Sequence, residues 1–334
     1  MLPLMEGKAK GLGMKIKWYL LSAGKLQEQP VIEGNLQTSL GETGESWFDV
    51  QDTDPEEIRK FLTPLDLHPL QLTRCLDSVN DPGVVSYGKS LLMEFPATFD
   101  RESADPSYLT ILLQDHVLVT VRHGEMGALD DLVSSLKGET TLPVLHLAQI
   151  IYMILDQFAD LNVDAQVAIR DQILLMSNTL AEYPGKVSIN DLSRLRAQVE
   201  NLVSLVENQL YCISGLNACD NEALHDPHRK AYIQDLLSEM EIAQRGIYRL
   251  ESRVKDLYND YQAAGSGRVE KRLRLLTIVS AITLPLGLVA GLLGMNVGGL
   301  PGTTTRSGFI IVLGLMILIV AVEYWYFKRK GWFD

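Results

Sequence analysis

An uncharged run near the C-terminus constrains this chain more than any other feature. No Asp, Glu, Lys or Arg occurs from Leu275 to Thr305, a run of 31 residues. A helix needs about 20 apolar residues to cross the bilayer core. A second apolar run begins at Ser307 and reaches that length when counted through Glu323 to Phe327. The two runs predict spans over 274–296 and 307–327, joined by a short Gly- and Pro-rich turn.

Basic residues bracket this hairpin, while Arg306 alone lies between the spans. Six flank the outer ends: Lys271, Arg272, Arg274, Lys328, Arg329 and Lys330. The positive-inside rule therefore places both termini in the cytoplasm. The alternative is one span plus a buried helix of a soluble domain, which would not explain basic clusters at both outer ends.

The net charge of −12 combines two different parts. Residues 271–334 carry a net charge of +5, so residues 1–270 carry −17. A body this acidic argues against a nucleic-acid partner, because phosphate binding needs a basic face. Three cysteines cannot form a disulfide framework and fit a reducing compartment. The first 21 residues lack the apolar core of a signal peptide.

Residues 1–142 mix short strand-like runs with turns and predict a cytoplasmic α/β domain. The expected strands are Met14–Leu21, Ser46–Val50, Ser90–Phe95, Leu109–Leu113 and Val117–Val121. A helix is expected to start at Asp54 and Pro55. Residues 143–273 predict a helical stalk, and residues 274–334 form the membrane hairpin.

The stalk contains three predicted helices. Apolar residues step by four and three from Leu147 to Ala168, and a break follows at Tyr183–Gly185. Ser188 starts the next helix as a cap, and it runs to about Asn217. The third series keeps a heptad from Leu236 to Tyr261. That heptad fits packing within one subunit, and it also fits a stalk that continues into the membrane as a pore helix, with Gly265-Ser266-Gly267 as its weak point.

The first span differs from a plain anchor because one helix face is small or hydroxylated. Steps of four and three give Leu273, Thr277, Ser280, Leu284, Gly287, Gly291 and Gly294. Such a face allows close helix contact or lines a narrow pore. Two spans of one chain cannot enclose a pore, so a pore requires a homo-oligomer.

Gly294-Met295-Asn296 at the outer end of the first span resembles the signature of the CorA family of divalent-cation transporters. Other segments resemble the same family over most of the chain: Trp47–Val50, Leu67–Leu70, Leu118–Val121, Leu276-Thr277, Leu284–Leu286 and Phe327–Trp332. The resemblance implies a funnel-shaped homopentamer, with a cytoplasmic α/β domain and stalk helices that lead into a five-helix pore.

The resemblance also implies that Gly294, Met295 and Asn296 form the selectivity filter. Five Asn296 amides can hydrogen-bond to the water shell of Mg²⁺, which dehydrates reluctantly. The alternative for Asn296 is a helix C-cap, a common position for Asn.

The loop after the signature departs from typical magnesium transporters of the family. Residues 297–302 contain no acid, where magnesium transporters carry a Pro-Glu pair. The neutral loop resembles the ZntB branch, which is associated with Zn²⁺ transport coupled to protons. At the cytoplasmic end, Gly267 and Glu270 stand where magnesium transporters have Asn. Glu270 is therefore a candidate inner ion ring, or it pairs with a neighbouring basic residue.

A second candidate metal site is the loop around His225 and His228 with Cys219, which carries zinc-type ligands. Its alternative is a polar loop. The acid-rich stretch 42–57 is either a cation sensor between subunits or a solvated face. No phosphate loop, HExxH motif or nucleophile elbow occurs, so no enzyme activity is expected.

These patterns predict transport of divalent cations, with Zn²⁺ favoured, across a bacterial inner membrane. The expected partners are the transported cations, other copies of the chain and lipid, with no resident cofactor beyond Zn²⁺ or Mg²⁺ in transit. Two alternatives remain. One is a Mg²⁺ or Co²⁺ channel gated by cytosolic Mg²⁺, and the other is a membrane-anchored sensor or scaffold that does not conduct.

Overall fold

The structure is a computed structural model that describes residues 15–22, 25–31, 35–41, 44–51, 54–76, 81–99, 106–122, 126–137, 145–219, 229–295 and 306–332. The chain divides into two compact units. Unit 1 comprises Met1–Thr179 and Val187–Lys255, and unit 2 comprises Leu180–Lys186 and Asp256–Asp334. The divisions at 179/180 and 255/256 fall inside helices, and the one at 186/187 falls in a turn. The boundaries expected from sequence at 142/143 and 273/274 stay predictions.

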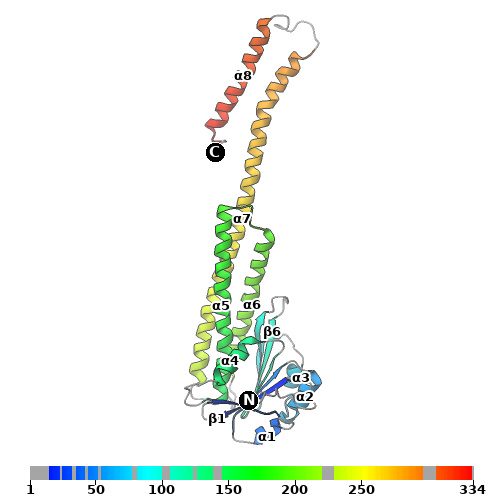
Figure 1. The fold of residues 1–334 in the computed structure, drawn as a ribbon, viewed down its shortest axis with the longest axis vertical. Helices are drawn as coiled ribbons and strands as arrows, with labels where there is room; N and C mark the ends of the chain where they lie inside the picture. Colours follow the sequence, from blue (N-terminus) through cyan, green and yellow to red (C-terminus); the bar gives the residue numbers. More distant parts are fainter. Residues whose placement is uncertain are drawn as a thin grey trace, which may run out of the picture. The chain divides into compact units, whose positions relative to one another are not determined.

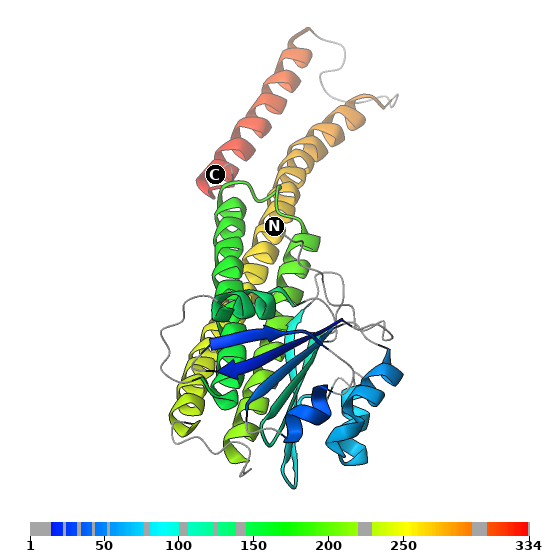
Figure 2. The ribbon, with the colours of Figure 1, turned by 60° about the horizontal axis from the view of Figure 1, so that its bottom comes forward.

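Unit 1 is built on a seven-stranded sheet with the order β2-β1-β3-β7-β6-β5-β4 (Figure 2). Only β3 and β7 pair in parallel; the other neighbours are antiparallel. The strands are β1 (Lys15–Ser22), β2 (Lys25–Gln29), β3 (Ser46–Gln51), β4 (Gly83–Tyr87), β5 (Ser90–Phe99), β6 (Pro106–Gln114) and β7 (Val117–Arg122). All five expected strands are present, whereas β2 and β4 at the two sheet edges were not expected.

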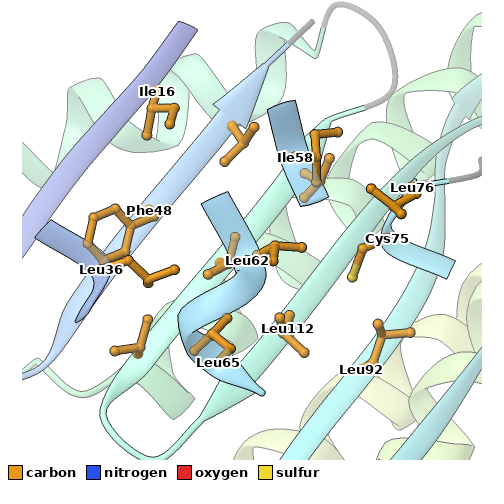
Figure 3. Close-up of a cluster of buried hydrophobic side chains, with 14 residues drawn as sticks. Ile16, Leu36, Phe48, Ile58, Leu62, Leu65, Cys75, Leu76, Leu92 and Leu112 are labelled. Carbon is orange, nitrogen blue, oxygen red and sulfur yellow. The ribbon is translucent and has the colours of Figure 1, made fainter. Parts of the chain in front are cut away.

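Short helices cover one face of this sheet: α1 (Asn35–Gly41), α2 (Pro55–Leu62), the 3-10 turn η1 (Thr63–Leu65) and α3 (Pro69–Leu76). Asp54 caps α2 by accepting a hydrogen bond from the Glu56 backbone N–H, and Pro55 occupies its first turn, as expected from sequence. Ile58 and Leu62 of α2 pack on Phe48 of β3 and Leu112 of β6 in a continuous apolar core (Figure 3).

Longer helices cover the other face: α4 (Gly127–Lys137), α5 (Leu147–Glu182) and α6 (Ile189–Ala218). The Phe95 ring of β5 lies 5.7 Å from the Phe158 ring of α5. From α6, Gln209 donates its side-chain amide to the carbonyl of Pro96 at 2.8 Å. Ser188 caps α6 by accepting from the Asn190 backbone N–H, which confirms the predicted helix start.

Helix α7 (Arg229–Leu293) is one continuous helix of 65 residues that contributes to both units. In unit 1 its predicted heptad is buried from Leu236 to Val254, against α5 and α6 of the same chain (Figure 1). The Tyr152 and Tyr232 rings of α5 and α7 lie 5.1 Å apart. Packing within one subunit therefore accounts for this part of the heptad.

The α5 series was predicted less well. Leu147 to Phe158 are buried as expected, but Ala165 and Ala168 are not, and the buried face continues through Asn162, Ile169 and Ile173. Steps of four and three repeat every 3.5 residues, whereas a straight helix repeats every 3.6, so the predicted stripe drifts off the core. The buried face of α5 is hard to recognise in the sequence because it includes the polar residue Asn162. The Asn162 side chain is buried and donates a hydrogen bond to the Gln209 side-chain carbonyl at 2.7 Å.

A buried ion pair joins the two parallel strands of the sheet. Asp49 of β3 accepts from the Arg122 guanidinium of β7 at 2.9 and 2.6 Å, and the Arg122 side chain is fully buried. The Thr120 hydroxyl donates to Asp49 and accepts from the Trp47 indole. Arg122 also lies 3.1 Å from Asp130 of α4. Arg122 keeps a raised pKa because these carboxylates outweigh the effect of burial.

Unit 2 contains the second part of α7 and the helix α8 (Arg306–Arg329). Both are long and apolar enough to cross a membrane, and the protein itself leaves their apolar stretches almost uncovered. α7 continues without a break through Gly265-Ser266-Gly267 and through Pro285. The Arg268 guanidinium donates to the Pro184 carbonyl at 2.6 Å, which ties α7 to the turn that follows α5.

We expect Asp49→Ala to lower the free energy of unfolding by about 3 kcal/mol, because a buried guanidinium loses its bidentate partner while Asp130 remains. The change is measured by unfolding the solubilised chain in guanidinium chloride and following its tryptophan fluorescence. Glu56→Ala is the control, since it removes an exposed pair with Arg59 at 3.6 Å and should cost less than about 1 kcal/mol. Equal losses in the two variants would contradict a structural role for the buried pair.

Candidate ion pathway and metal sites

The small-residue face expected from sequence is an exposed stripe on α7. We call the set Leu273, Thr277, Ser280, Leu284, Gly287 and Gly291 the pore-face stripe. Every member is exposed in the single chain, with Leu284 at 74%. The stripe ends at Gly294 and Met295, which follow the last turn of α7 and are also exposed. Asn296 and the loop at 297–305 lie outside the described residues.

The opposite face of α7 is turned toward α8. Ile282 and Leu286 of α7 share an apolar groove with Val320 and Tyr324 of α8, and both α7 residues are half-buried. Ile282 and Leu284 point about 200° apart around the helix axis. The pore-face stripe is therefore the side of α7 that its own hairpin leaves free. Figure 1 shows α8 running beside this part of α7.

Local structure leaves the stripe open and partly polar. The Thr277 hydroxyl donates to the Leu273 carbonyl at 2.8 Å, one turn earlier. No atom lies within 4 Å of where a Cβ would stand at Gly287 or Gly291, so space rather than crowding surrounds both glycines. At Gly294 a Cβ would meet the Ala290 carbonyl at 3.1 Å, because the Gly294 N–H closes the helix on that carbonyl.

Glu270 lies at the basic end of the span and has a partner. Its carboxylate accepts from the Arg274 guanidinium at 2.8 Å, one helical turn away. Both side chains are exposed enough that water weakens the pair. The sequence suggested Lys271 or Arg272 as the partner; the observed one is Arg274, because residues i and i+4 share a helix face.

The candidate zinc ligands are only partly described. Cys219 follows the end of α6, is half-exposed and is not in a disulfide. His225 and His228 lie outside the described residues. Among the residues that the structure describes, no group of three or more His, Cys, Asp or Glu side chains is arranged to hold a metal ion.

The acid-rich stretch 42–57 does not form one acidic face in its described part. Asp49 is buried in its pair with Arg122. Asp54 caps α2, and Glu45 accepts from the Leu147 backbone N–H at the start of α5. These carboxylates have structural partners, while Glu42 and Asp52 fall outside the described residues.

A different acidic cluster, which was not expected from the sequence, lies on α5 and α7. Asp156 and Asp160 come from α5, and Asp235 and Glu239 come from α7. Burial raises the pKa of Asp156, and the carboxylates of Asp160 and Asp235 raise it further. Burial and the same neighbours raise the pKa of Glu239. Only an alignment of the two helices, almost 80 residues apart in sequence, would have brought these side chains together.

Comparison with known proteins agrees with this architecture. The family model for the CorA-like Mg²⁺ transporter protein matches residues 42–329. YfjQ of Bacillus subtilis is 24% identical over 294 residues, covering 86% of this chain and 90% of that protein. The zinc transport protein ZntB of Yersinia enterocolitica is 22% identical over 261 residues, covering 75% of this chain and 76% of that protein.

A solved structure shares the fold over the whole chain. The complete structure of the CorA magnesium transporter from Methanocaldococcus jannaschii superposes with a TM-score of 0.81 at 17% identity, covering 99% of this chain and 100% of that chain. The family match, which spans most of the sequence and both membrane helices, is the decisive comparison. The chain therefore belongs to the family of CorA-like Mg²⁺ transporter proteins.

Proposed function

We propose that this protein carries divalent metal cations across the bacterial inner membrane through a pore formed by five copies of α7. The observation that carries the proposal is the pore-face stripe, an exposed and partly hydroxylated face opposite α8 in a chain of this family. One chain cannot close a pore, so the stripe needs copies of itself as neighbours. Both termini lie in the cytoplasm, as the basic residues at the outer ends of the hairpin favour.

Chemistry along the stripe suits a hydrated cation. Thr277 and Ser280 offer hydroxyl oxygens, and Gly287 and Gly291 leave room for a water shell. At the outer mouth, Gly294, Met295 and Asn296 act as the filter, where a ring of Asn296 amides hydrogen-bonds to ion-bound water. Because water stays on the ion, the protein need not supply the full dehydration energy.

Zn²⁺ is the favoured ion. The loop at 297–302 has no carboxylate, so the mouth lacks the acidic residues of typical magnesium transporters. The ZntB relative, named as a zinc transport protein, aligns over three quarters of the chain. With weak attraction at the mouth, the driving force comes from the membrane potential, about 4.6 kcal/mol per divalent cation per 100 mV, and from proton cotransport.

Glu323 supports the proton coupling. It is an ionisable residue in the α8 span, and such residues are rare in membrane segments unless they serve transport. One of its carboxyl oxygens is buried without a hydrogen-bond partner among the described residues. We therefore assign the proton exchange of the transport cycle to the carboxyl of Glu323.

The second candidate function is a Mg²⁺ or Co²⁺ channel that cytosolic Mg²⁺ closes. The family model, described as that of a CorA-like Mg²⁺ transporter protein, favours it, although the acidic cluster on α5 and α7 is not arranged to hold a metal ion. A non-conducting scaffold is the third possibility, and the flux experiment below separates all three.

Proteoliposomes that contain a metal-responsive dye should show Zn²⁺ entry faster than Mg²⁺ entry. Asn296→Ala should reduce Zn²⁺ flux about tenfold, the loss expected from hydrogen bonds to an ion's water shell. Thr304→Ala, a polar-to-Ala change in the same loop, is the matched control and should keep full flux. Absence of flux for both ions would overturn transport altogether. Unchanged flux in Asn296→Ala, with an intact oligomer, would remove Asn296 from the filter.

Accessibility to water tests the stripe directly. In a Cys219→Ser background, Ser280→Cys should react with a charged, water-soluble thiol reagent at least tenfold faster than Val279→Cys, which is turned about 100° around the helix. The remaining native thiols should not react with the reagent, because burial raises the pKa values of Cys75 and Cys212 to about 12. Equal labelling at the two positions would contradict a water-filled passage along this face.

Glu323→Gln should abolish the dependence of Zn²⁺ flux on a pH gradient, since Gln cannot exchange a proton. The measured quantity is the ratio of flux with the gradient to flux without it, which should fall to one. Glu270→Gln is the control acid, because it lies outside the span and should leave the ratio unchanged even if total flux falls. A ratio that persists in Glu323→Gln would show that another group carries the proton, and a ratio of one in the wild type would remove proton coupling.

A further inference from the structure

We infer that the groove between α7 and α8 holds an acyl chain of an anionic phospholipid, whose headgroup rests on Lys328, Arg329 and Lys330. This inference concerns a lipid partner, so it holds or fails independently of which ion the protein carries.

The groove is apolar and sizeable. It encloses about 500 Å³ within unit 2, and only apolar surface faces into it. Ile282 and Leu286 line it from α7, and Met316, Ile317, Val320 and Tyr324 line it from α8. A site with no polar lining cannot hold ordered water, so it requires hydrocarbon. In a membrane the nearest hydrocarbon is a lipid tail.

Tyr324 connects this groove to the basic end of α8. Its ring lines the groove, and the Lys328 ammonium lies 6.0 Å from the ring centroid. The next two cations also lie over the aromatic ring four residues before them. The Arg329 guanidinium lies 5.3 Å from the Trp325 ring centroid, and the Lys330 ammonium lies 5.1 Å from the Tyr326 ring centroid. Aromatic rings at this depth normally lie at the level of the lipid headgroups. A lipid tail in the groove therefore brings its phosphate next to Lys328 and to the membrane level of Arg329 and Lys330.

Among the described residues, which end at Trp332, no ion pair involves Lys328, Arg329 or Lys330. Arg274, at the corresponding end of α7, pairs with Glu270. Basic clusters on the cytoplasmic side of membrane helices attract anionic headgroups, so a lipid phosphate suits the three cations.

The charge of these cations makes an anionic lipid the occupant that we propose, because its phosphate is complementary to them. A helix of a second copy would bring the basic residues Lys271 and Arg272 instead, and it is an outcome of the test.

The test uses photocrosslinking of the full chain in vesicles of phosphatidylcholine with a minor share of phosphatidylglycerol. p-Benzoylphenylalanine replaces Tyr324, an aromatic substitution at the groove, and in a second sample replaces Val322, which is exposed on another face. After illumination, mass spectrometry identifies the adducts. We expect phosphatidylglycerol adducts at Tyr324 at least about fivefold above its share of the bilayer, the gain from one basic residue near the headgroups, and adducts at Val322 that follow the bilayer composition.

Two further variants separate charge from fold. Combining Lys328→Gln, Arg329→Gln and Lys330→Gln should return the adducts at Tyr324 to the bilayer ratio, whereas Lys328→Arg with Lys330→Arg should keep the enrichment. Adducts at the bilayer ratio in the unsubstituted basic cluster would overturn the inference. So would enrichment that survives loss of all three charges, or a chain-to-chain adduct at Tyr324 in place of lipid.

Discussion

Uncovered apolar surface is the constraint on which the membrane half of this protein depends. Leu275 is 67% exposed and Phe309 is 72% exposed, and no described part of the protein covers either of them. A bilayer covers such side chains, but it offers no partner for backbone polar groups, so the segments must be helical. The same constraint confines the charges to the helix ends, where Arg274 and Lys328 meet water. The need to cover this apolar surface with lipid thus accounts for the helical hairpin and for the position of its charges.

Unit 1 faces a different constraint, because it has an excess of acidic residues around a buried apolar core. The net charge of −17 on residues 1–270, most of which lie in unit 1, does not spread evenly over a surface. Asp49 is buried against Arg122, Asp54 caps a helix, and Asp156 keeps its proton more tightly than an exposed carboxyl would. Breaking the Asp49 pair, which joins the parallel strands β3 and β7, would leave a desolvated guanidinium.

Elements with a regular apolar pattern were predicted from the sequence. Polar strands, polar core residues and sites formed by segments distant in sequence were missed. The strands β3, β5, β6 and β7 are apolar and were expected, whereas β2 reads Lys-Leu-Gln-Glu-Gln and has only Leu26 buried. The heptad of α7 was correct because its apolar residues are uninterrupted. The face of α5 was misjudged where Asn162 enters the core. The pore-face stripe needed only helix geometry, but the acidic cluster required two helices to be aligned, which a single sequence does not reveal.

The glycine pair in α7 has a mechanical consequence. Gly265 and Gly267 are helical without any neighbour filling the space of a Cβ, and each weakens a helix by about 1 kcal/mol relative to Ala. Bending of this 65-residue rod is therefore easiest at that point, directly before the apolar stretch. Arg268, bonded to the Pro184 carbonyl, braces the soft segment from outside the helix. This hydrogen bond therefore adds a second restraint at the turn where the helix itself is weakest.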